Sequence, residues 1–543
     1  MYRVLTIFCF LLFIAYGSEC QVLPKEGSVL NYRIIGFSFP ENSKAGSYKL
    51  DIAAGRFNNE DSFNRHVVSS VKSRNNKIIC EVPSFASEYT WRITATGADM
   101  AKTGVSLHHF KTGYAIFVDS SVVRLRIIDP ATRYNDHYIF SDASRTLYDM
   151  KGKPVWYLPG FTDNQAIRDL KQTPQGSVTF LENENAYEAD YNGTILWRGP
   201  AEGSISGDTA EHFHHELTKV SNGDYMVLGM ESVLWKHKLP APIDSSQVLD
   251  PIKKAKQDSI LTHEKTQFGT IIEYNAKGDI VWYWKCSKYF MESDLKYYHP
   301  VYGFRTIDVH ENAFYFNEKD SVIYVSFKNI SRLLKIKYPS GDVINAYGEI
   351  YQEDGRQAPN TLFCDQHSCR QSKSGELYMF NNNSCNESSE LPEVLLLQEP
   401  TDGGNLLKKV WAYNCQIGGL DTEKRYKMQE RKQKALEKVQ QMRLAKNQSM
   451  LPSGTNLNPH ATTGGNVIEL PDGSFFVCMN SQYGKIFIVN RKKEVLFAAL
   501  TERWRPADKK WVAMPQQYRA SIITRQEMER MVWSTEANEA SSK

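Results

Sequence analysis

Residues 146–158, TLYDMKGKPVWYL, decide the fold, because the same unit returns five more times along the chain. Each copy has an alternating apolar and polar segment, a tight turn, and a second segment that often ends in an aromatic residue. This alternation on either side of a turn rich in Gly, Asn, Asp or Lys is typical of a β-hairpin. The other copies are NAYEADYNGTILW (185–197), TIIEYNAKGDIVWYW (270–284), RLLKIKYPSGDVINAYG (332–348), VLLLQEPTDGGNLLKKVWAY (394–413) and KIFIVNRKKEVLFAA (485–499).

A second kind of hairpin precedes most of these copies. Its examples are TPQGSVTFL (173–181), VSNGDYMVLG (220–229), SKSGELYMF (372–380) and LPDGSFFVCM (470–479). Four strands per unit, repeated six times, predict an all-β fold, a six-bladed β-propeller whose blades surround a central channel. A sandwich of unrelated hairpins is the alternative, and the matching registers of the copies disfavour it.

Two segments lie outside the repeats. Residues 21–115 contain about seven short alternating strands, which predict a small N-terminal β-sandwich ahead of a propeller over 116–543. The charged stretch 421–450 predicts a surface helix inserted late in the propeller. Little apolar surface accompanies its basic charge, so we interpret it as a solvated face rather than a binding patch.

The start of the chain has the form of a secretory signal over residues 1–20. Arg3 is followed by the apolar run 4–16 and then by small residues. That run is too short to span a membrane, and no other stretch is long enough, so we expect an exported, soluble, periplasmic protein without a transmembrane segment. Cys20 follows Glu19, not the small residue that lipid attachment requires, which argues against a lipoprotein.

The composition excludes several classes of protein. Lys and Arg number 65 and Asp and Glu 62 in 543 residues, a net charge of +3 that gives no reason to expect binding to nucleic acid. Aromatic residues make up 12% of the chain, which favours β-structure. No C-x-x-C pair occurs, so a zinc ribbon is not expected. The spacing allows Cys364 to pair with Cys369 and Cys385 with Cys415.

The repeats also bring candidate site residues together. Counting back eight residues from the glycine of the second hairpin turn gives Arg168, His215 and His367, and His310 occupies the matching start of its own strand. The innermost strands of a propeller line its channel, so these side chains should meet. Lys328 and His214 add positive charge nearby, and such a set of donors suits an anion. Asp308 and Glu216 are expected to orient imidazoles, and neither a metal nor another cofactor is predicted.

At these residues the chain resembles the bacterial arylsulfate sulfotransferases, and the resemblance runs through nearly all of the mature chain. The matching motifs are Asp308-Val-His310-Glu-Asn312-Ala313, Ser326-Phe-Lys328-Asn329-Ile-Ser331, Gln366-His367 and His214-His215-Glu216. Members of that family are exported six-bladed propellers with an N-terminal β-sandwich. They move a sulfuryl group from a phenolic sulfate ester to another phenol without a nucleotide, through a transiently sulfated histidine.

The resemblance implies a role for each matching position. His367 is then the nucleophile, while His215 and His310 bind the sulfuryl oxygens and handle protons. Lys328 stands where the family has arginine, which keeps the charge but loses the planar two-pronged contact. We expect Asn312 to bind substrate, and Tyr298 and Tyr302 to hold the phenyl rings. Cys364 and Cys369 flank His367 where the family has a disulfide, and their pairing is open.

Two other functions stay open. Three histidines could hold a divalent cation in a propeller lyase that acts on uronate sugars. The chain could also be a non-catalytic binding propeller. The oligomeric state is open as well, with a homodimer as one option.

Overall fold

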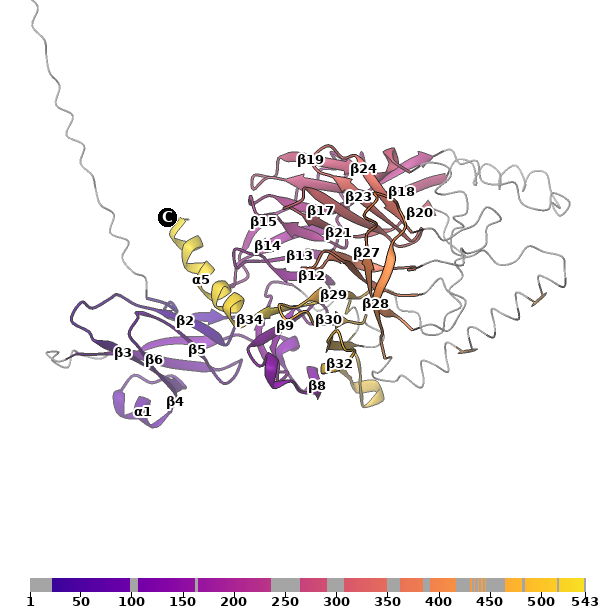
Figure 1. Cartoon of the computed structure of the whole chain (residues 1–543). Helices are drawn as coiled ribbons and strands as arrows, with labels where there is room; N and C mark the ends of the chain where they lie inside the picture. The colour runs from indigo at the N-terminus through magenta and orange to yellow at the C-terminus, as the bar shows by residue number, and fades with distance from the viewer. Residues whose placement is uncertain are drawn as a thin grey trace, which may run out of the picture. The chain divides into compact units, whose positions relative to one another are not determined.

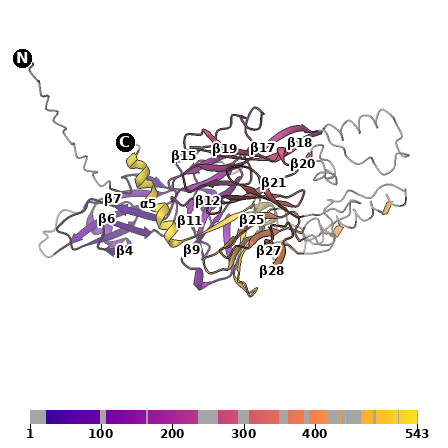
Figure 2. The same ribbon diagram turned by 45° about the horizontal axis from the view of Figure 1, so that its top comes forward.

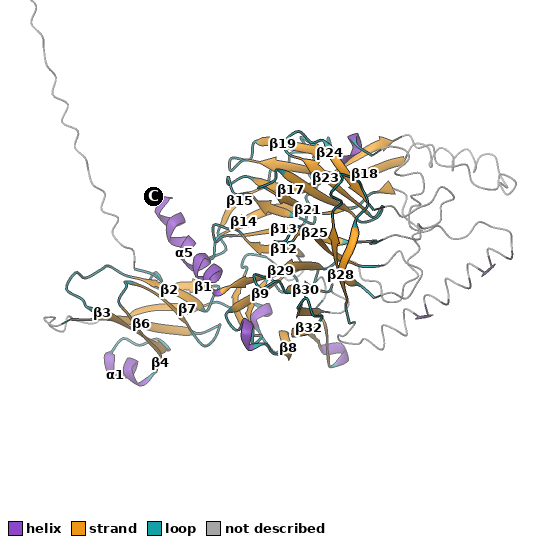
Figure 3. Cartoon of the chain, in the orientation of Figure 1, coloured by secondary structure: helices purple, strands orange, loops and turns teal. Residues whose placement is uncertain are grey.

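The structure of the protein is a computed structural model, in which strands predominate (Figure 3). It describes residues 22–97, 106–161, 165–235, 264–290, 307–348, 362–383, 391–416, 464–480, 484–514 and 517–541, and scattered helical positions between 430 and 445. The chain divides into two compact units, residues 1–114 and residues 115–543. Within the described ranges, no helix combines the length and the apolar character that a membrane crossing requires.

The first unit holds a five-stranded sheet in the order β1-β7-β6-β3-β4 and a two-stranded sheet of β2 and β5. Phe37, Trp91 and Phe110 pack between these elements, with ring centroids 5.1 and 6.1 Å from that of Phe37. The elements are β1 (Ser28–Leu30), β2 (Ile34–Ser38), β3 (Ser47–Ala54), α1 (Glu60–Arg65), β4 (Val67–Ser73), β5 (Lys77–Glu81), β6 (Glu88–Thr96) and β7 (His108–Thr112).

The described residues of the second unit form six sheets, numbered here from the first to the sixth in chain order. The first sheet contains β9 (His137–Ser141), β10 (Thr146–Asp149), β11 (Pro154–Tyr157) and β34 (Ala520–Thr524), and the second contains β12 (Ile167–Gln172), β13 (Val178–Glu182), β14 (Asn185–Ala189) and β15 (Ile195–Arg198). The third contains β16 (Leu217–Lys219), β17 (Tyr225–Trp235), β18 (Glu264–Tyr274), β19 (Ile280–Lys285) and β20 (Ile307–Asp308).

The remaining three sheets follow the same pattern. The fourth contains β21 (Glu311–Asn317), β22 (Val322–Phe327), β23 (Arg332–Lys337) and β24 (Val343–Tyr347), and the fifth contains β25 (His367–Gln371), β26 (Leu377–Asn381), β27 (Glu393–Gln398) and β28 (Lys408–Asn414). The sixth contains β29 (Asn466–Glu469), β30 (Phe475–Cys478), β31 (Lys485–Val489), β32 (Val495–Arg505), β33 (Lys510–Ala513) and β8 (Val123–Asp129). The chain ends with α5 (Arg525–Ser541), and short 3₁₀ turns lie at Ile116–Val118, Thr132–Tyr134, Cys286–Lys288 and Pro506–Asp508.

All six repeated hairpins predicted from the sequence form antiparallel pairs. Consecutive sheets contact one another in chain order, and the sixth returns to the first through β30 and β34. The two ends of the unit are exchanged: β34, near the C-terminus, pairs with β9, while β8, near the start of the unit, pairs with β32 (Figure 1). Figure 2 shows β9 beside α5, the helix that follows β34. The unit is therefore an all-β, propeller-like fold.

The aromatic residues that end the repeats join neighbouring sheets. Trp156 of the first sheet donates its indole N–H to the carbonyl of Tyr191, which follows the second sheet's β14, at 2.7 Å. Trp197 of the second sheet stacks on Tyr225 of the third, with ring centroids 3.9 Å apart. Trp411 of the fifth donates to the carbonyl of Arg491 in the sixth at 2.9 Å. In these three sheets the tryptophan of the repeat is therefore a contact with the next sheet.

Neither cysteine pairing that the spacing allowed forms. Cys369 and Cys415 are buried free thiols, whereas Cys364 is disulfide-bonded to a cysteine outside the described residues. Burial raises the pKa of the Cys369 thiol, which keeps it protonated and unreactive. Of the predicted helix at 421–450, the structure describes only scattered positions, which are helical and exposed.

Candidate active site

Left-handed backbone marks the starts of the inner strands. Asp169, His215, His310 and Ser368 have φ of +56°, +61°, +55° and +57° in four successive sheets. Such a conformation costs about 1–3 kcal/mol for a residue other than glycine, and it concentrates at functional sites. Register shifts fall at or beside these positions in β12, β21 and β25. Bulges of this kind re-aim side chains, and here they turn the first residues of the inner strands toward one region.

Three histidines form a tight cluster. The ring centroids of His215 and His310 lie 5.1 Å apart, and those of His215 and His214 lie 4.8 Å apart. Nδ1 of His214 and Nδ1 of His215 are 2.7 Å apart, and Nε2 of His214 lies 3.2 Å from the carbonyl of Gly229. A carbonyl only accepts, so His214 donates there, and in its neutral form it must accept from His215. Nε2 of His215 then carries a lone pair.

The described hydrogen-bond partners of the His367 ring both lie at Nδ1. Its Nδ1 lies 3.0 Å from the carbonyl of Asp365 and 2.7 Å from the side-chain amide of Asn382. A proton on Nδ1 donates to this carbonyl and leaves the lone pair on Nε2, which has no hydrogen bond to any described residue, whereas a proton on Nε2 leaves Nδ1 to accept from the amide nitrogen of Asn382. Burial, followed by the charges of Lys328 and His310, holds the pKa of His367 well below its usual value. The imidazole is therefore neutral at physiological pH.

Tyr518 lies between the two parts of the site. Its ring centroid is 5.5 Å from that of His215 and 6.1 Å from that of His367. The guanidinium of Arg168 lies 5.3 Å from the same ring. The phenolic oxygen is buried and has no hydrogen-bond partner among the described residues, and burial raises the pKa of Tyr518 to about 12. Tyr518 thus places a neutral phenol ring beside both imidazoles. A methyl group on Gly464 would meet the Tyr518 ring at 2.8 Å, so this ring position requires glycine there.

Two cations, Lys328 and Arg168, lie near the site. Nζ of Lys328 is 3.8 Å from Oδ1 of Asp365 and 3.4 Å from Oδ1 of Asn329. Burial raises the pKa of Asp365, while Lys328 and His310 work against that rise. Arg168 is exposed. The predicted His215, His310, His367, Lys328 and Arg168 are thereby brought into one region.

A buried network of ion pairs lies next to the site and joins the inner strands of several sheets. Arg519, 4% exposed, donates from one nitrogen to Asp169 at 2.8 Å and to Glu216 at 2.6 Å. Lys171 and Arg370 donate to the same Glu216 carboxylate at 2.7 and 2.9 Å. Burial alone would raise the pKa of Glu216, but the three cations outweigh it and hold the pKa well below its usual value. Glu216 binds these cations, so the prediction that it orients an imidazole is corrected.

Asn312 is bound to the backbone of the neighbouring sheet. Its side chain is fully buried and donates to the backbone carbonyl of Gln366 at 2.7 Å. Gln366 in turn donates from its amide to Oγ of Ser326 at 3.1 Å. These residues link the fourth and fifth sheets directly behind His367. The geometry favours a positioning role for Asn312 over the substrate contact predicted from the sequence.

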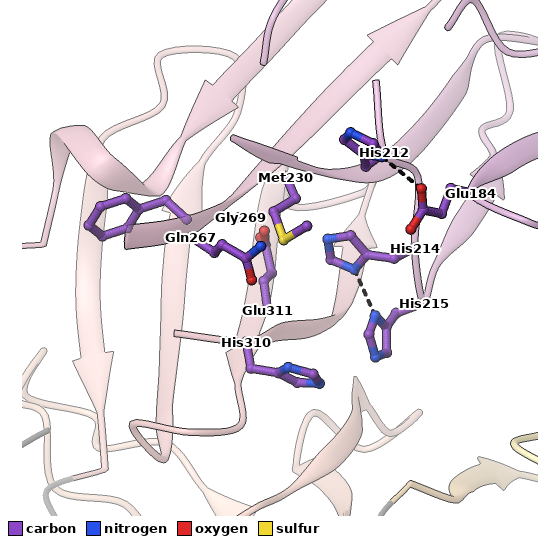
Figure 4. Close-up of a pocket in the computed structure, with 10 residues that line it drawn as sticks. Glu184, His212, His214, His215, Met230, Gln267, Gly269, His310 and Glu311 are labelled. Carbon is purple, nitrogen blue, oxygen red and sulfur yellow. Dashed lines mark hydrogen bonds and ion pairs between the residues drawn. The ribbon is translucent and has the colours of Figure 1, made fainter. Parts of the chain in front are cut away.

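A cavity of about 190 Å³ opens beside the histidine cluster. His214, His215 and His310 line it, together with Met230, Gln267 and Glu311. Figure 4 shows Gln267 and Glu311 on one side of the cavity, and His214 and His215 on the other. His367 does not line this cavity but lies beyond Tyr518.

Some predicted residues lie outside what the structure describes. Tyr298 and Tyr302 are in the segment 291–306, and the side chain of Asp308 is not described either. Their predicted roles stay predictions. Among the described residues, no three His, Cys, Asp or Glu side chains are grouped as metal ligands would be.

Tyr518 and Arg519 were missed by the sequence analysis for a topological reason. They immediately precede β34, the inner strand of the first sheet, which comes from the end of the chain and lacks the second hairpin that marks the other inner strands. The alternating segment QYRASIIT (517–524) is the only signal of this strand in the sequence. The start of the second unit supplies only three strands to the first sheet. Searching the rest of the sequence for the missing fourth strand could have found this segment.

The ring of sheets and the cluster of imidazoles and cations define a propeller-like protein with a cluster of hydrogen-bond donors. Residues 132–395 match the family model described as Arylsulfotransferase (ASST). This match confirms the predicted resemblance to the arylsulfotransferase family. It spans His214, His215, His310, Lys328 and His367 but ends before Tyr518 and Arg519.

Other comparisons add little. No curated protein matches the chain. Solved structures that match include a Bacteroides caccae protein of unknown function, with 11% identity over 74% of this chain and 99% of that chain and a TM-score of 0.36. The periplasmic gluconolactonase PpgL of Pseudomonas aeruginosa matches with 9% identity over 74% and 99% and a TM-score of 0.34. An auxiliary nutrient binding protein from Bacteroides thetaiotaomicron has 10% identity over 94% and 95% and a TM-score of 0.31. At such low TM-scores these likenesses carry no argument.

Proposed function

We propose that the protein is an aryl sulfate sulfotransferase that moves a sulfuryl group from a phenolic sulfate ester to a phenol in two displacements through a sulfohistidine. The observation that supports it most is the approach of His215, His310 and His367 to one another around Tyr518, the three histidines lying in the segment that matches the arylsulfotransferase family. A neutral imidazole with a free lone pair is a competent nucleophile.

In the first displacement, Nε2 of His367 attacks sulfur and the S–O bond to the phenol breaks. The leaving phenolate takes a proton from His310, which faces His215 in the cluster. Protonating a leaving group whose conjugate acid has a pKa of about 10 favours its departure at neutral pH. Lys328 and Arg168 stabilise the charge on the sulfuryl oxygens. By analogy with one oxyanion-hole donor, removing either cation should raise the activation free energy by about 3 kcal/mol.

In the second displacement, the acceptor phenol occupies the place that the first phenol has left. Its hydroxyl proton passes to the neutral Nε2 of His215, and its oxygen attacks the sulfur held on His367. The S–N bond breaks, which restores neutral His367, and the proton taken up by His215 passes to His310, whose ring centroid is 5.1 Å away, so that both imidazoles return to their starting states. Burial, then the charges of His214 and His310, hold the pKa of His215 well below its usual value, so this imidazole is free of a proton when the acceptor arrives.

The test is to trap the intermediate. We expect that incubation with 4-nitrophenyl sulfate, quenching at alkaline pH and mass spectrometry of the peptides will find one sulfuryl group on His367. His367→Asn should lose both the adduct and the release of nitrophenol, whereas His212→Asn, which changes the exposed partner of Glu184 at the cavity rim, should keep the adduct. Adduct formation without His367 would show that the nucleophile is another residue. A chelator should not change the rate, and a rate that depends on added divalent metal would favour the lyase.

Several finer expectations belong to the same proposal. The ring of sheet contacts supports six blades, and the two sheets of the first unit support an N-terminal sandwich that ends near residue 115. Export through the segment 1–20 stays a prediction from the sequence.

A further inference from the structure

Glu311 is a buried carboxyl group without a protein partner in the cavity wall. It is 1% exposed, and neither of its carboxyl oxygens has a hydrogen bond to any described residue. The position of this carboxyl group requires a glycine at residue 269. Oε2 of Glu311 packs against the backbone there, and a methyl group added to Gly269 would lie 1.5 Å from it. Leaving a buried polar group unpaired costs about 1–3 kcal/mol, so a ligand that pairs with it is favoured.

The carboxyl group is directed to the same cavity as the histidines. In an extended strand, consecutive side chains point to opposite faces, but the left-handed backbone of His310, with φ of +55°, interrupts this alternation. Both His310 and Glu311 therefore line the cavity (Figure 4). A small ring bound against His310 in this cavity can therefore also contact the carboxyl group of Glu311.

The charge state of Glu311 limits what it can bind. Burial raises the pKa of Glu311 well above its usual value, and among the described residues no neighbouring charge contributes to the shift. The group is therefore a neutral carboxylic acid at physiological pH, with one O–H donor and an acceptor carbonyl. An uncharged group that both donates and accepts, such as a hydroxyl, complements it. The cavity of about 190 Å³ is smaller than the roughly 300–1,000 Å³ of pockets for drug-sized ligands, which suits a single substituted ring.

We infer that this cavity is a phenol-binding subsite in which Glu311 pairs with a second hydroxyl group, so that the acceptors of the enzyme are dihydroxylated rings rather than simple phenols. The inference rests on the proposed function, because that function supplies the phenol. It makes Glu311 a specificity-determining residue. A site that hydrogen-bonds a substrate hydroxyl discriminates against the analogue that lacks it, because its own polar group is then left unpaired.

The experiment compares acceptors that differ only in a hydroxyl or a methyl group, with 4-nitrophenyl sulfate as donor. The pairs are catechol with 2-methylphenol, resorcinol with 3-methylphenol, and hydroquinone with 4-methylphenol. For at least one pair we expect the hydroxylated ring to have a kcat/KM about tenfold higher, as one neutral hydrogen bond to a buried group provides. If the hydroxylated and the methylated ring of every pair have equal kcat/KM, the inference is overturned by the wild-type protein alone.

Two variants assign the preference to Glu311. Glu311→Met, which is similar in volume and apolar, should reduce the ratio of kcat/KM between the hydroxylated and the methylated ring to about one. Glu311→Gln, which still donates and accepts hydrogen bonds, should retain most of that ratio. Glu273→Gln is the matched control, because Glu273 is also buried but is hydrogen-bonded to Tyr338 and does not line the cavity. A ratio that survives in Glu311→Met overturns the inference. A preference for tyramine that Glu311→Gln abolishes also overturns it, in favour of a cation site.

Binding measurements separate this inference from the proposed function. If no acceptor is sulfated, isothermal titration of the same pairs into the wild type and Glu311→Met shows whether the hydroxyl is recognised. Tighter binding of the hydroxylated ring that disappears in Glu311→Met supports the subsite although the proposed function has failed. No difference in affinity overturns both.

Discussion

Lys328 has two effects on the proposed chemistry, and both follow from its charge. A cation near the sulfuryl oxygens stabilises the charge that develops on them. The same cation disfavours protonation of His367, and after burial it is the largest reason why the pKa of that imidazole is low. A positive side chain at this position therefore keeps the nucleophile neutral as well as binding the anion. Lysine provides both effects, although it lacks the two-pronged contact of arginine.

The acid limb of the pH profile should lie below pH 6.5. Attack requires neutral His367, and a pKa lowered from 6.5 means that the neutral form persists as the pH falls through 6.5 and is lost only at the lower, folded-state value. We expect kcat/KM for 4-nitrophenyl sulfate to stay level down to that point and then to decline. A decline centred at 6.5 or higher would contradict the depressed pKa.

Substitutions of Lys328 provide the control for this profile. Lys328→Met removes a charge that disfavours the imidazolium, so the acid limb should move toward higher pH while kcat/KM falls about 10²–10³-fold. Lys328→Arg keeps the charge, so the limb should not move.

At the scale of the element, the tryptophan that ends a repeat hairpin contributes to stability through its contact with the next sheet. Trp156 is fully buried and donates to the carbonyl of Tyr191 at 2.7 Å. Trp156→Phe keeps most of the apolar volume but removes the indole donor from that buried carbonyl. We expect the free energy of unfolding, measured by urea denaturation, to fall by about 2 kcal/mol.

Trp282 provides the matched comparison, because its indole donates to the carbonyl of Pro339 at an equal 2.7 Å but in an exposed position. Water can replace the lost donor there, so Trp282→Phe should cost under about 1 kcal/mol. Equal losses for the two variants would mean that the stabilisation comes from ring packing alone.

The repeats predicted these elements well, and the exceptions have physical reasons. Hairpins are local, so alternation and turn residues were enough to predict all six. The histidine positions followed from the shared register of the inner strands. Tyr518 and Arg519 could not be found in this way, because β34 pairs with β9 across almost the whole unit and carries no hairpin of its own. The role of Asn312 depends on which neighbour its amide meets, and a motif does not carry that information.

At the scale of the whole molecule, the two exchanged strands and one arginine unite the ends of the second unit. Arg519 belongs to the first sheet, and its side chain reaches Asp169 of the second, Glu216 beside the third and the carbonyl of Asn312 in the fourth. Arg370 extends the network to the fifth sheet through Glu216. The ring of sheets is thereby closed at its centre by charge as well as at its edge by strand pairing.

Removing this arginine should destabilise the whole unit. Arg519→Met removes the more buried of the two cations that bridge Asp169 and Glu216, the other being Lys171, and breaking a buried pair in this way typically costs about 3–5 kcal/mol. We expect a loss of that size in the free energy of unfolding by urea denaturation. Arg525→Met is the control, because Arg525 is 63% exposed and its pair with Glu529 at 3.0 Å lies on the surface, where such pairs contribute about 0–1 kcal/mol. Similar small losses for both variants would show that Lys171 and Arg370 neutralise Glu216 without Arg519, and that strand exchange alone closes the ring.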